Sequence, residues 1–228
     1  MNYAESLFLR HGETTYNIQE IVQGWNDSPL SKLGVLQAKC TGYGLRNISF
    51  VKAYSGDASR QIDSAVNFMN ENLNPAEIIC DYHFREMCYG KYEEGSYEAM
   101  LGPLFEAFQE KYHGYDGLYR YYDDFEIVEQ LLKRDETGRF EGLERVWKRV
   151  SQGIDAILKE HDEGNILIST SSFTIATVIH KLFPDFKQPR LVENASISII
   201  SYNGTYLLLD YNNIEYRKKG EKHFADKL

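Results

Sequence analysis

Short apolar runs alternate with stretches of helical periodicity at the start of the chain, and this alternation constrains the fold more than any other feature. The apolar runs at 5–10, 50–54 and 76–80 have the length of buried strands. Between them the pattern predicts one helix over 31–47, capped by its first serine, and another over 57–70. Strands separated by helices pair in parallel through right-handed crossovers, so we predict an α/β fold.

The rest of the chain continues the pattern after an interruption. The sequence predicts a long amphipathic helix over 142–161, a central strand over 165–169 and a helix over 172–183. Two apolar runs joined by Asn203-Gly204 predict a hairpin that adds antiparallel strands at one edge. We therefore expect a three-layer sandwich with a mostly parallel central sheet, and a solvated tail over 215–224.

Two finer predictions concern the packing of the early helices. In the helix over 31–47 the expected inner residues are Leu33, Leu36 and Leu45. In the helix over 57–70 the expected inner residues are Ile62, Ala65, Val66 and Met69.

The interruption lies between residues 88 and 140, which are rich in tyrosine and glycine and show no clean strand period. We interpret this region as an insertion that folds over one end of the sheet. The sequence is thus expected to form a single domain over 1–228, with a lid insertion at about 91–140.

Composition excludes several classes of partner. The formal net charge of −9 disfavours nucleic acid. No run approaches the roughly 18 apolar residues that span a bilayer, and no signal peptide is recognisable, so we expect no membrane partner. The three cysteines are an odd number, which argues against a disulfide framework and fits the cytoplasm. The oligomeric state is left open.

Polar residues follow the carboxyl ends of the predicted parallel strands, where ligands bind in such sheets. Arg10 and His11 end the first strand, and Arg60 lies near the start of the helix after the second. Glu86 follows the third strand, and Ser171 follows the fourth. We expect these side chains to meet at one rim of the sheet.

Two arginines beside one imidazole indicate a phosphate site, because guanidinium groups bind phosphate oxygens in pairs. His11 can attack phosphorus, giving a phosphohistidine that water resolves, if its other ring nitrogen donates to a nearby carbonyl. Gly12 is expected to let the backbone approach the phosphate. Glu86 can protonate the leaving oxygen and then deprotonate the water. The arginines supply the positive charge, so this chemistry needs no metal and no cofactor.

These residues stand in an order that resembles the histidine phosphatase superfamily, in its phosphoglycerate-mutase-like branch. The resemblance is carried by "LRHGETTYN" (9–17), "QGWNDSPLSKLGVLQAK" (23–39), "SGDASRQIDSA" (55–65) and "FREMCYG" (84–90). The following "KYEEG" is one residue longer than the family's usual spacing. The resemblance covers nearly the whole chain except the tyrosine-rich insertion.

The resemblance implies a role for each matched residue. It makes His11 the phosphorylated nucleophile and Glu86 the proton donor, with a small phosphorylated compound as substrate. The residues implied in phosphate binding are Arg10, Arg60 and Asn17, and those implied in substrate binding are Gln23 and Gly24.

One block departs from the family pattern. Where the family carries Ser-His-Gly-Gly after the fourth strand, this chain has Thr170-Ser171-Ser172-Phe173. A lost charge-assisted hydrogen bond costs roughly 1.5–3 kcal/mol, or about tenfold to 150-fold in rate. We expect Ser171 to be a fourth phosphate-binding residue and to compensate in part, because it can cap the next helix while the free N–H groups there favour an anion.

The leading hypothesis is therefore a phosphomonoesterase that acts through a phosphohistidine and is slowed by the missing imidazole. A family member that binds a phosphorylated ligand without turnover is the first alternative, favoured by Ser171. A phosphoglycerate mutase is the second, although 91–140 lacks the mutase-like insertion that the resemblance leads us to expect.

Overall fold

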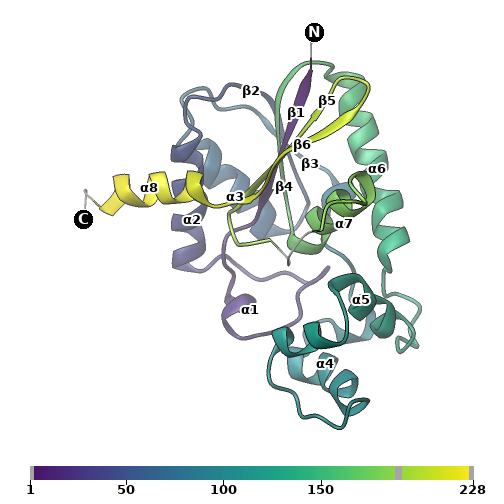
Figure 1. The fold of residues 1–228 in the computed structure, drawn as a ribbon. Helices are drawn as coiled ribbons and strands as arrows, with labels where there is room; N and C mark the ends of the chain where they lie inside the picture. The colour runs from purple at the N-terminus through teal and green to yellow at the C-terminus, as the bar shows by residue number, and fades with distance from the viewer. Residues whose placement is uncertain (1–2, 188–191, 226–228) are drawn as a thin grey trace.

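The computed structural model describes residues 3–187 and 192–225, which form a six-stranded sheet with helices on both faces (Figure 1). The strand order is β3-β2-β4-β1-β5-β6. The first four strands pair in parallel, and the β5–β6 hairpin joins β1 in antiparallel orientation. The predicted sandwich with its mostly parallel sheet is confirmed. The strands are β1 (Ala4–Arg10), β2 (Phe50–Ser55), β3 (Ile78–Cys80), β4 (Gly164–Thr170), β5 (Ile197–Tyr202) and β6 (Tyr206–Asn213).

Helices cover both faces of the sheet, so the central strands are buried on both sides. In β4, Ile166 and Ile168 join the hydrophobic cluster on the α6 and α7 side, whereas Leu167 joins the cluster that faces α2 and α3. This alternation follows from the two-residue period of a strand. The helices of the two outer layers are α2 (Lys32–Gly44), α3 (Ser59–Met69), α6 (Leu143–Glu160), α7 (Ser172–Leu182) and α8 (Glu215–Ala225).

Helix α2 buries a different face from the one that its leucines predict. Leu33 is 51% exposed and Leu36 is 37% exposed, although Leu45 is buried as expected. The buried face consists of small residues, because neighbouring backbones approach it closely. A Cβ atom at Gly34 would lie 2.0 Å from the carbonyl oxygen of Glu13. In the same way α3 leaves Val66 exposed and buries Phe68 instead; these two predicted inner faces were wrong in part.

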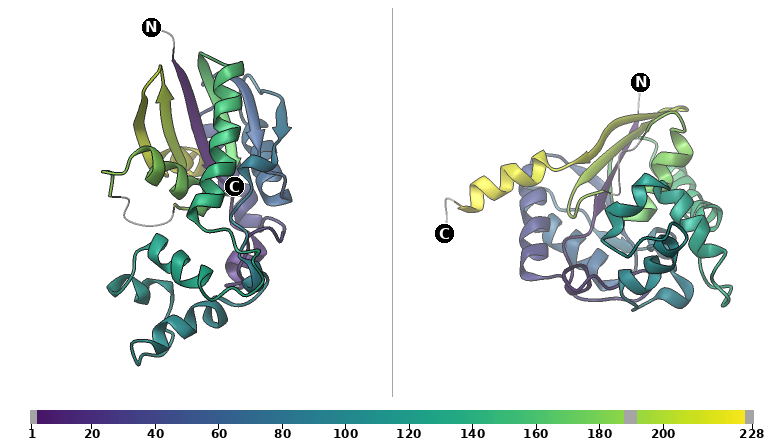
Figure 2. Two further views of the ribbon diagram at one scale, coloured as in Figure 1. Left: turned by 90° about the vertical axis from the view of Figure 1, so that its right-hand side faces the viewer. Right: turned by 60° about the horizontal axis from the view of Figure 1, so that its bottom comes forward.

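The predicted solvated tail was also wrong, because residues 215–225 form α8 and pack along α2 (Figure 2). The contact is close: a Cβ atom at Gly220 would lie 2.1 Å from the carbonyl oxygen of Cys40. The rings of Tyr43 and His223 stack with their centroids 3.8 Å apart. The sequence of α8 is mostly polar and lacks an apolar stripe that would predict a packed helix. Its contact with α2 instead depends on a glycine and two rings.

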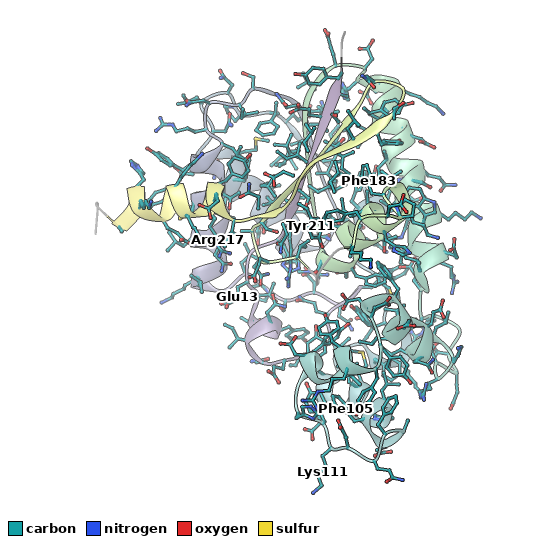
Figure 3. All side chains as sticks on the ribbon, viewed as in Figure 1. Glu13, Phe105, Lys111, Phe183, Tyr211 and Arg217 are labelled. Carbon is teal, nitrogen blue, oxygen red and sulfur yellow. The ribbon has the colours of Figure 1, made fainter. Side chains whose placement is uncertain are left out.

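The segment 91–140 lies beyond the carboxyl ends of the parallel strands (Figures 1 and 2). Its buried apolar side chains, Phe105 among them, belong to the same hydrophobic cluster as Phe8 and Ile168 of the sheet, while Lys111 extends from its outer end (Figure 3). Among the described residues, no helix is both long and apolar enough to cross a bilayer. The short elements near the rim are α1 (Thr15–Ile18), η1 (Tyr82–Phe84), η2 (Gly90–Tyr92), α4 (Tyr97–Glu106), η3 (Tyr115–Arg120) and α5 (Asp124–Leu132).

Candidate active site

The end of β1 carries the first two candidate residues to the rim of the sheet. Arg10 is in register with Thr170 of β4, and the His11 N–H donates to the Thr170 carbonyl at 3.0 Å. The chain then passes α2 at Gly12, where a Cβ atom would lie 2.2 Å from the Gly34 carbonyl oxygen. The Gly12 N–H donates to a serine hydroxyl. The absence of a Cβ at Gly12 therefore lets this loop pack against the backbone of α2.

His11 is held as a neutral imidazole with one ring nitrogen unprotonated. Its Nδ1 lies 2.8 Å from the carbonyl oxygen of Gly12. A carbonyl only accepts, so Nδ1 carries the proton and Nε2 keeps its lone pair. Burial lowers the pKa of His11 well below its usual value, and the charges of Arg60 and Arg10 lower it further. This is the state that a nucleophilic imidazole requires.

Arg60 is completely buried, and its guanidinium group is fixed by the loop that contains Gly24. Nη2 donates to the Gly24 carbonyl at 2.7 Å, and Nη1 donates to the Asn26 carbonyl at 2.8 Å. Nη1 also pairs with Asp27 at 3.1 Å. The Nε–H group, however, is buried without a hydrogen-bond partner among the described residues.

Arg10 likewise has a buried guanidinium N–H group without a hydrogen-bond partner among the described residues. Its Nη1 donates to the carbonyl of Val192, while its buried Nε–H group lacks a partner in the described part of the chain. Burial lowers the pKa of Arg10, yet a guanidinium group stays protonated in proteins. The buried Nε–H groups of both arginines near His11 are thus without a hydrogen-bond partner among the described residues.

Glu86 lies across the start of α7. Its Oε2 accepts from the Phe173 N–H at 3.1 Å, and its Oε1 accepts from the N–H groups of Thr174 at 3.2 Å and Met87 at 2.8 Å. These donors and the two arginines favour the charged carboxylate. Burial outweighs them and raises the pKa of Glu86, so the group can hold a proton to higher pH than an exposed glutamate.

Ser171 is the first residue after β4 and the N-cap residue of α7, but its side chain does not cap the helix. Its buried Oγ accepts from Gln61 Nε2 at 2.8 Å. The N–H groups of Phe173 and Thr174 are taken by Glu86 instead. The expected serine cap and the expected free N–H groups are therefore wrong, because a charged carboxylate from another loop occupies that place.

The remaining predicted residues organise the loops around these groups. Asn17 Oδ1 accepts from Asn194 Nδ2 at 3.3 Å, and the same Nδ2 donates to the His11 carbonyl at 3.0 Å. The amide of Gln23 is buried between the hydroxyl groups of Thr14 and Ser28. Gly24 contributes its carbonyl to Arg60. In this geometry Gln23 supports a loop, and both ends of its amide are occupied by protein groups.

Sequence reasoning missed Glu93, which holds the loop that fixes Arg60. Its carboxylate accepts from three consecutive backbone N–H groups at 24–26, at 2.9–3.2 Å. It also accepts from Asn26 Nδ2 at 3.0 Å and from the Tyr89 N–H at 2.8 Å. The signal was present in "KYEEG", where two acidic residues, Glu93 and Glu94, follow the block that contains Glu86.

Arg149 was missed as well, because it lies on α6, far along the chain, where an arginine in an amphipathic helix suggests a solvated face. It is instead buried and pairs with Glu141, with Nη2 2.9 Å from Oε2. Its guanidinium group donates to the carbonyls of His83 at 2.8 Å, Arg85 at 3.1 Å and Glu86 at 3.2 Å. It therefore fixes the turn that presents Glu86.

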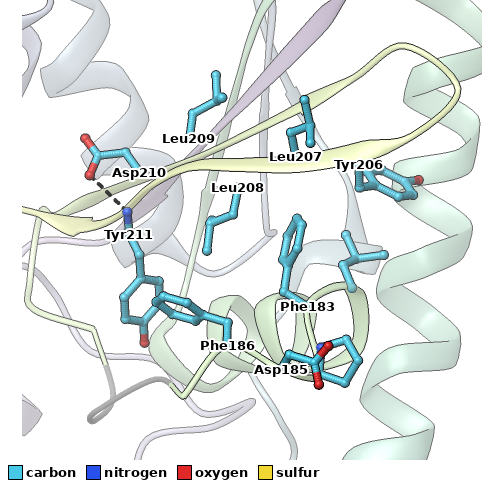
Figure 4. Close-up of a pocket in the computed structure, with 11 residues that line it drawn as sticks. Phe183, Asp185, Phe186, Tyr206, Leu207, Leu208, Leu209, Asp210 and Tyr211 are labelled. Carbon is cyan, nitrogen blue, oxygen red and sulfur yellow. Dashed lines mark hydrogen bonds between the residues drawn. The ribbon is translucent and has the colours of Figure 1, made fainter.

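A cavity of about 660 Å³ lies elsewhere, between the end of α7 and β6 (Figure 4). Phe183, Phe186, Leu208 and Tyr211 face one another across it. The charged residues among those described around it are aspartates, which would repel an anion. It is not a candidate for the phosphate.

Comparison with known proteins places the chain among relatives. The model of the histidine phosphatase superfamily (branch 1) matches residues 6–214. The crystal structure of phosphoglycerate mutase from Bacillus anthracis str. Sterne is 28% identical, with a TM-score of 0.87, and the match covers 96% of this chain and 97% of that one.

Two curated relatives match over shorter stretches. A 2,3-bisphosphoglycerate-dependent phosphoglycerate mutase of Methanococcus vannielii is 33% identical over 49% of this chain and 48% of its own length. The fructose-2,6-bisphosphatase TIGAR of Xenopus tropicalis is 39% identical over 37% of this chain and 32% of its own length. The chain thus spans about half or less of the length of these curated relatives. From the extent of the family match and the agreement in fold, the chain belongs to the histidine phosphatase superfamily.

Proposed function

We propose that the chain is a phosphomonoesterase that hydrolyses a small phosphorylated substrate through a phosphohistidine at His11. The observation that carries the proposal is the pair of unused, buried Nε–H groups on Arg10 and Arg60 beside a neutral imidazole. A buried donor without a partner costs about 1–3 kcal/mol, so two of them at one place favour a missing anionic ligand. The relatives reported above are named for small phosphorylated compounds.

The reaction uses the groups in two steps. Nε2 of His11 attacks phosphorus, the phosphorus–oxygen bond to the alcohol breaks, and protonated Glu86 gives its proton to the leaving oxygen. The Nδ1–H bond to the Gly12 carbonyl stabilises the cationic phosphoimidazole. Water then attacks phosphorus while the Glu86 carboxylate takes the water's proton, and neutral His11 leaves with its lone pair restored. Arg10 and Arg60 neutralise the phosphoryl oxygens in both steps.

We further propose that Ser171 occupies the position of the family's second imidazole, and that turnover is slower because this imidazole is missing. Its Oγ accepts from Gln61 Nε2, which leaves the hydroxyl proton for a phosphate oxygen. Asn17 is proposed to bind the same phosphate, and the loop of Gln23 and Gly24 to border the substrate. The chain is taken as one domain over 1–228, with 91–140 as its lid. The free Cys40, Cys80 and Cys88 suit the cytoplasm.

The test is hydrolysis of para-nitrophenyl phosphate by the wild type, by His11→Ala and by a control, His223→Ala, which removes a histidine on α8. We expect His11→Ala to lose at least about a thousandfold in kcat and the control to lose nothing. Wild type quenched with a phosphorus-32 ester should carry an acid-labile label that His11→Ala lacks. Equal turnover by wild type and His11→Ala would reject the proposal.

Two alternative functions predict different results in hydrolysis, labelling, calorimetry and an isomerisation assay. The serine at position 171 provides no imidazole for the phosphate, which favours a protein that binds phosphate without turnover. In that case calorimetry would detect phosphate binding, while neither hydrolysis nor labelling would be observed. The similarity to proteins named as phosphoglycerate mutases favours a mutase. Isomerisation of 3-phosphoglycerate without release of phosphate would identify that activity.

A further inference from the structure

A second cavity, of about 320 Å³, lies between the segment 91–140 and the rim of the sheet. Asn17 forms part of one wall and Phe173 part of another. The walls contributed from the segment and its approach are almost entirely rings and aliphatic side chains. They include Tyr89, Tyr97, Tyr115, Met100, Ile127 and Leu131.

This cavity adjoins the proposed phosphate position. Phe173 donates its N–H to Glu86, so its ring extends from a residue that is hydrogen-bonded to the acid. Asn17, which also lines the cavity, accepts through Oδ1 from the same Asn194 Nδ2 that donates to the His11 carbonyl, so the cavity borders the nucleophile. An alcohol attached to a phosphoryl group beside His11 would therefore extend between the rings of the cavity.

The size and lining of the cavity indicate what the alcohol is. A closed cavity of about 150 Å³ accommodates benzene, so roughly twice that volume accommodates a fused pair of rings. Burying apolar surface against these walls is favourable because it removes that surface from water. Aromatic groups gain further from edge and offset contacts with the tyrosines and with Phe173.

Charge around the cavity opposes a second anionic group. None of the described residues that line it is a lysine, arginine or histidine, and the charged residue among them is Glu20, which is exposed at the rim. Lys111 points away at the outer end of the segment (Figure 3). An anion placed here would lose water and gain from these walls only neutral amide and phenol donors, without a cation to balance its charge.

We propose that the substrate is a phosphomonoester of an uncharged aromatic or apolar alcohol, and that Phe173 and the tyrosines select it. The inference rests on the proposed function, because it concerns the alcohol part of the same ester. It excludes as preferred substrates the esters whose alcohol carries a carboxylate or a second phosphate.

The first experiment measures kcat/KM of the wild type for 2-(1-naphthyl)ethyl phosphate, glucose 6-phosphate and 3-phosphoglycerate, which are all esters of weakly acidic alcohols. We expect 2-(1-naphthyl)ethyl phosphate to exceed each of the others at least about tenfold, the effect of roughly 1.4 kcal/mol. A higher value for either of the other esters would overturn the substrate class while leaving the phosphatase proposal intact. No hydrolysis of any of the three would instead count against the phosphatase proposal and, with it, this inference.

The second experiment tests the charge at the rim with Glu20→Lys. We expect the ratio of kcat/KM for 3-phosphoglycerate to that for 2-(1-naphthyl)ethyl phosphate to rise at least about threefold, because the change replaces repulsion by attraction. Glu163→Lys makes the same change of charge at the opposite, amino end of β4, and should leave the ratio unchanged. An equal shift in both variants would show only a long-range effect of net charge, and no shift in either would remove Glu20 from the cavity's selectivity; both results contradict the proposal.

Discussion

The two ends of the candidate site are built in different ways. At the phosphate end, Arg60, Glu86 and Glu93 each make several hydrogen bonds, mostly to backbone groups. In the cavity beside it, the walls are rings and aliphatic chains that pack without such a network. Directional bonds fix a reaction geometry, whereas apolar walls select by shape and area. Changes at the first end should therefore alter the rate for esters of any alcohol size, and changes at the second should reorder the esters by the size and polarity of the alcohol.

The largest effect is expected from Glu86→Gln, which removes the proton donor. For an alkyl phosphate, whose alcohol leaves poorly without a proton, kcat should fall about a hundredfold to ten-thousandfold. For para-nitrophenyl phosphate, whose leaving group needs less help, the fall should be much smaller. Steady-state kinetics with esters of equal size and different acidity would check this. A fall that follows the size of the alcohol would break the division between the two ends.

Glu86→Gln also tests which groups set the pH dependence of kcat/KM. Glu86 acts while protonated, so the rate should decline as pH rises through its pKa, and burial raises that pKa and moves the decline to higher pH. His11 acts while neutral, and its pKa is lowered well below the usual value, so the decline on the acid side should lie well below neutrality. Glu86→Gln should abolish the alkaline decline and keep the acid one. A pH profile of kcat/KM that keeps its alkaline limb would assign that limb to another group.

Arg60→Lys is expected to have the next largest effect. Lysine keeps the charge but loses the planar fork and the unused Nε–H group. Phosphate should bind about tenfold to 150-fold more weakly, which corresponds to one charge-assisted hydrogen bond. Calorimetry with inorganic phosphate measures this, and Arg46→Lys, whose guanidinium lies over the ring of Tyr43, is the control. Unchanged affinity in Arg60→Lys would mean that Arg60 only supports the loop.

The double variant Ser171→His with Phe173→Gly acts on both ends at once. The new imidazole should raise the rate for para-nitrophenyl phosphate at least about tenfold, and glycine gives it room. The gain should disappear when His11→Ala is added. Phe173→Gly alone is the control: it should lower the preference for 2-(1-naphthyl)ethyl phosphate without raising the rate. A well-folded double variant with no gain would favour the protein that binds without turnover.

The smallest effect is expected from Glu93→Gln. A neutral amide oxygen accepts more weakly than a carboxylate, and here it must serve several donors. The loop over 24–26 should then fix Arg60 less firmly, so the affinity for phosphate and for phosphate esters should fall about threefold to tenfold alike. Thermal unfolding would detect the weakened loop and calorimetry the lower affinity, with the adjacent Glu94→Gln as the matched control. Equal behaviour of the two variants would remove Glu93 from the site.

How far the sequence predicted this molecule depended on the range of the interactions. The strands and most helices follow from local periodicity, and the motif blocks placed Arg10, His11 and Glu86 at the rim. Local patterns failed where contacts join distant segments. Arg149 reaches the turn of Glu86 from another helix, and the small face of α2 is set by backbones that only the folded chain brings near. The tyrosines of 91–140 could be counted but not positioned, because no period in the sequence fixes them.

Glu86 has a further consequence for how chains of this kind can change over generations. Its carboxylate occupies the start of α7, and a helix cap contributes about 0.5–2 kcal/mol to a protein whose stability is about 5–15 kcal/mol. Selection for a stable fold would preserve this glutamate even in a descendant that had stopped turning over substrate. His11 is under no such double constraint, because its ring is hydrogen-bonded to the neighbouring Gly12 carbonyl and, within the described part of the chain, satisfies no helix N–H group. When lineages of this fold are compared, loss of the histidine therefore indicates loss of the chemistry. Persistence of the glutamate does not indicate that the chemistry has been kept.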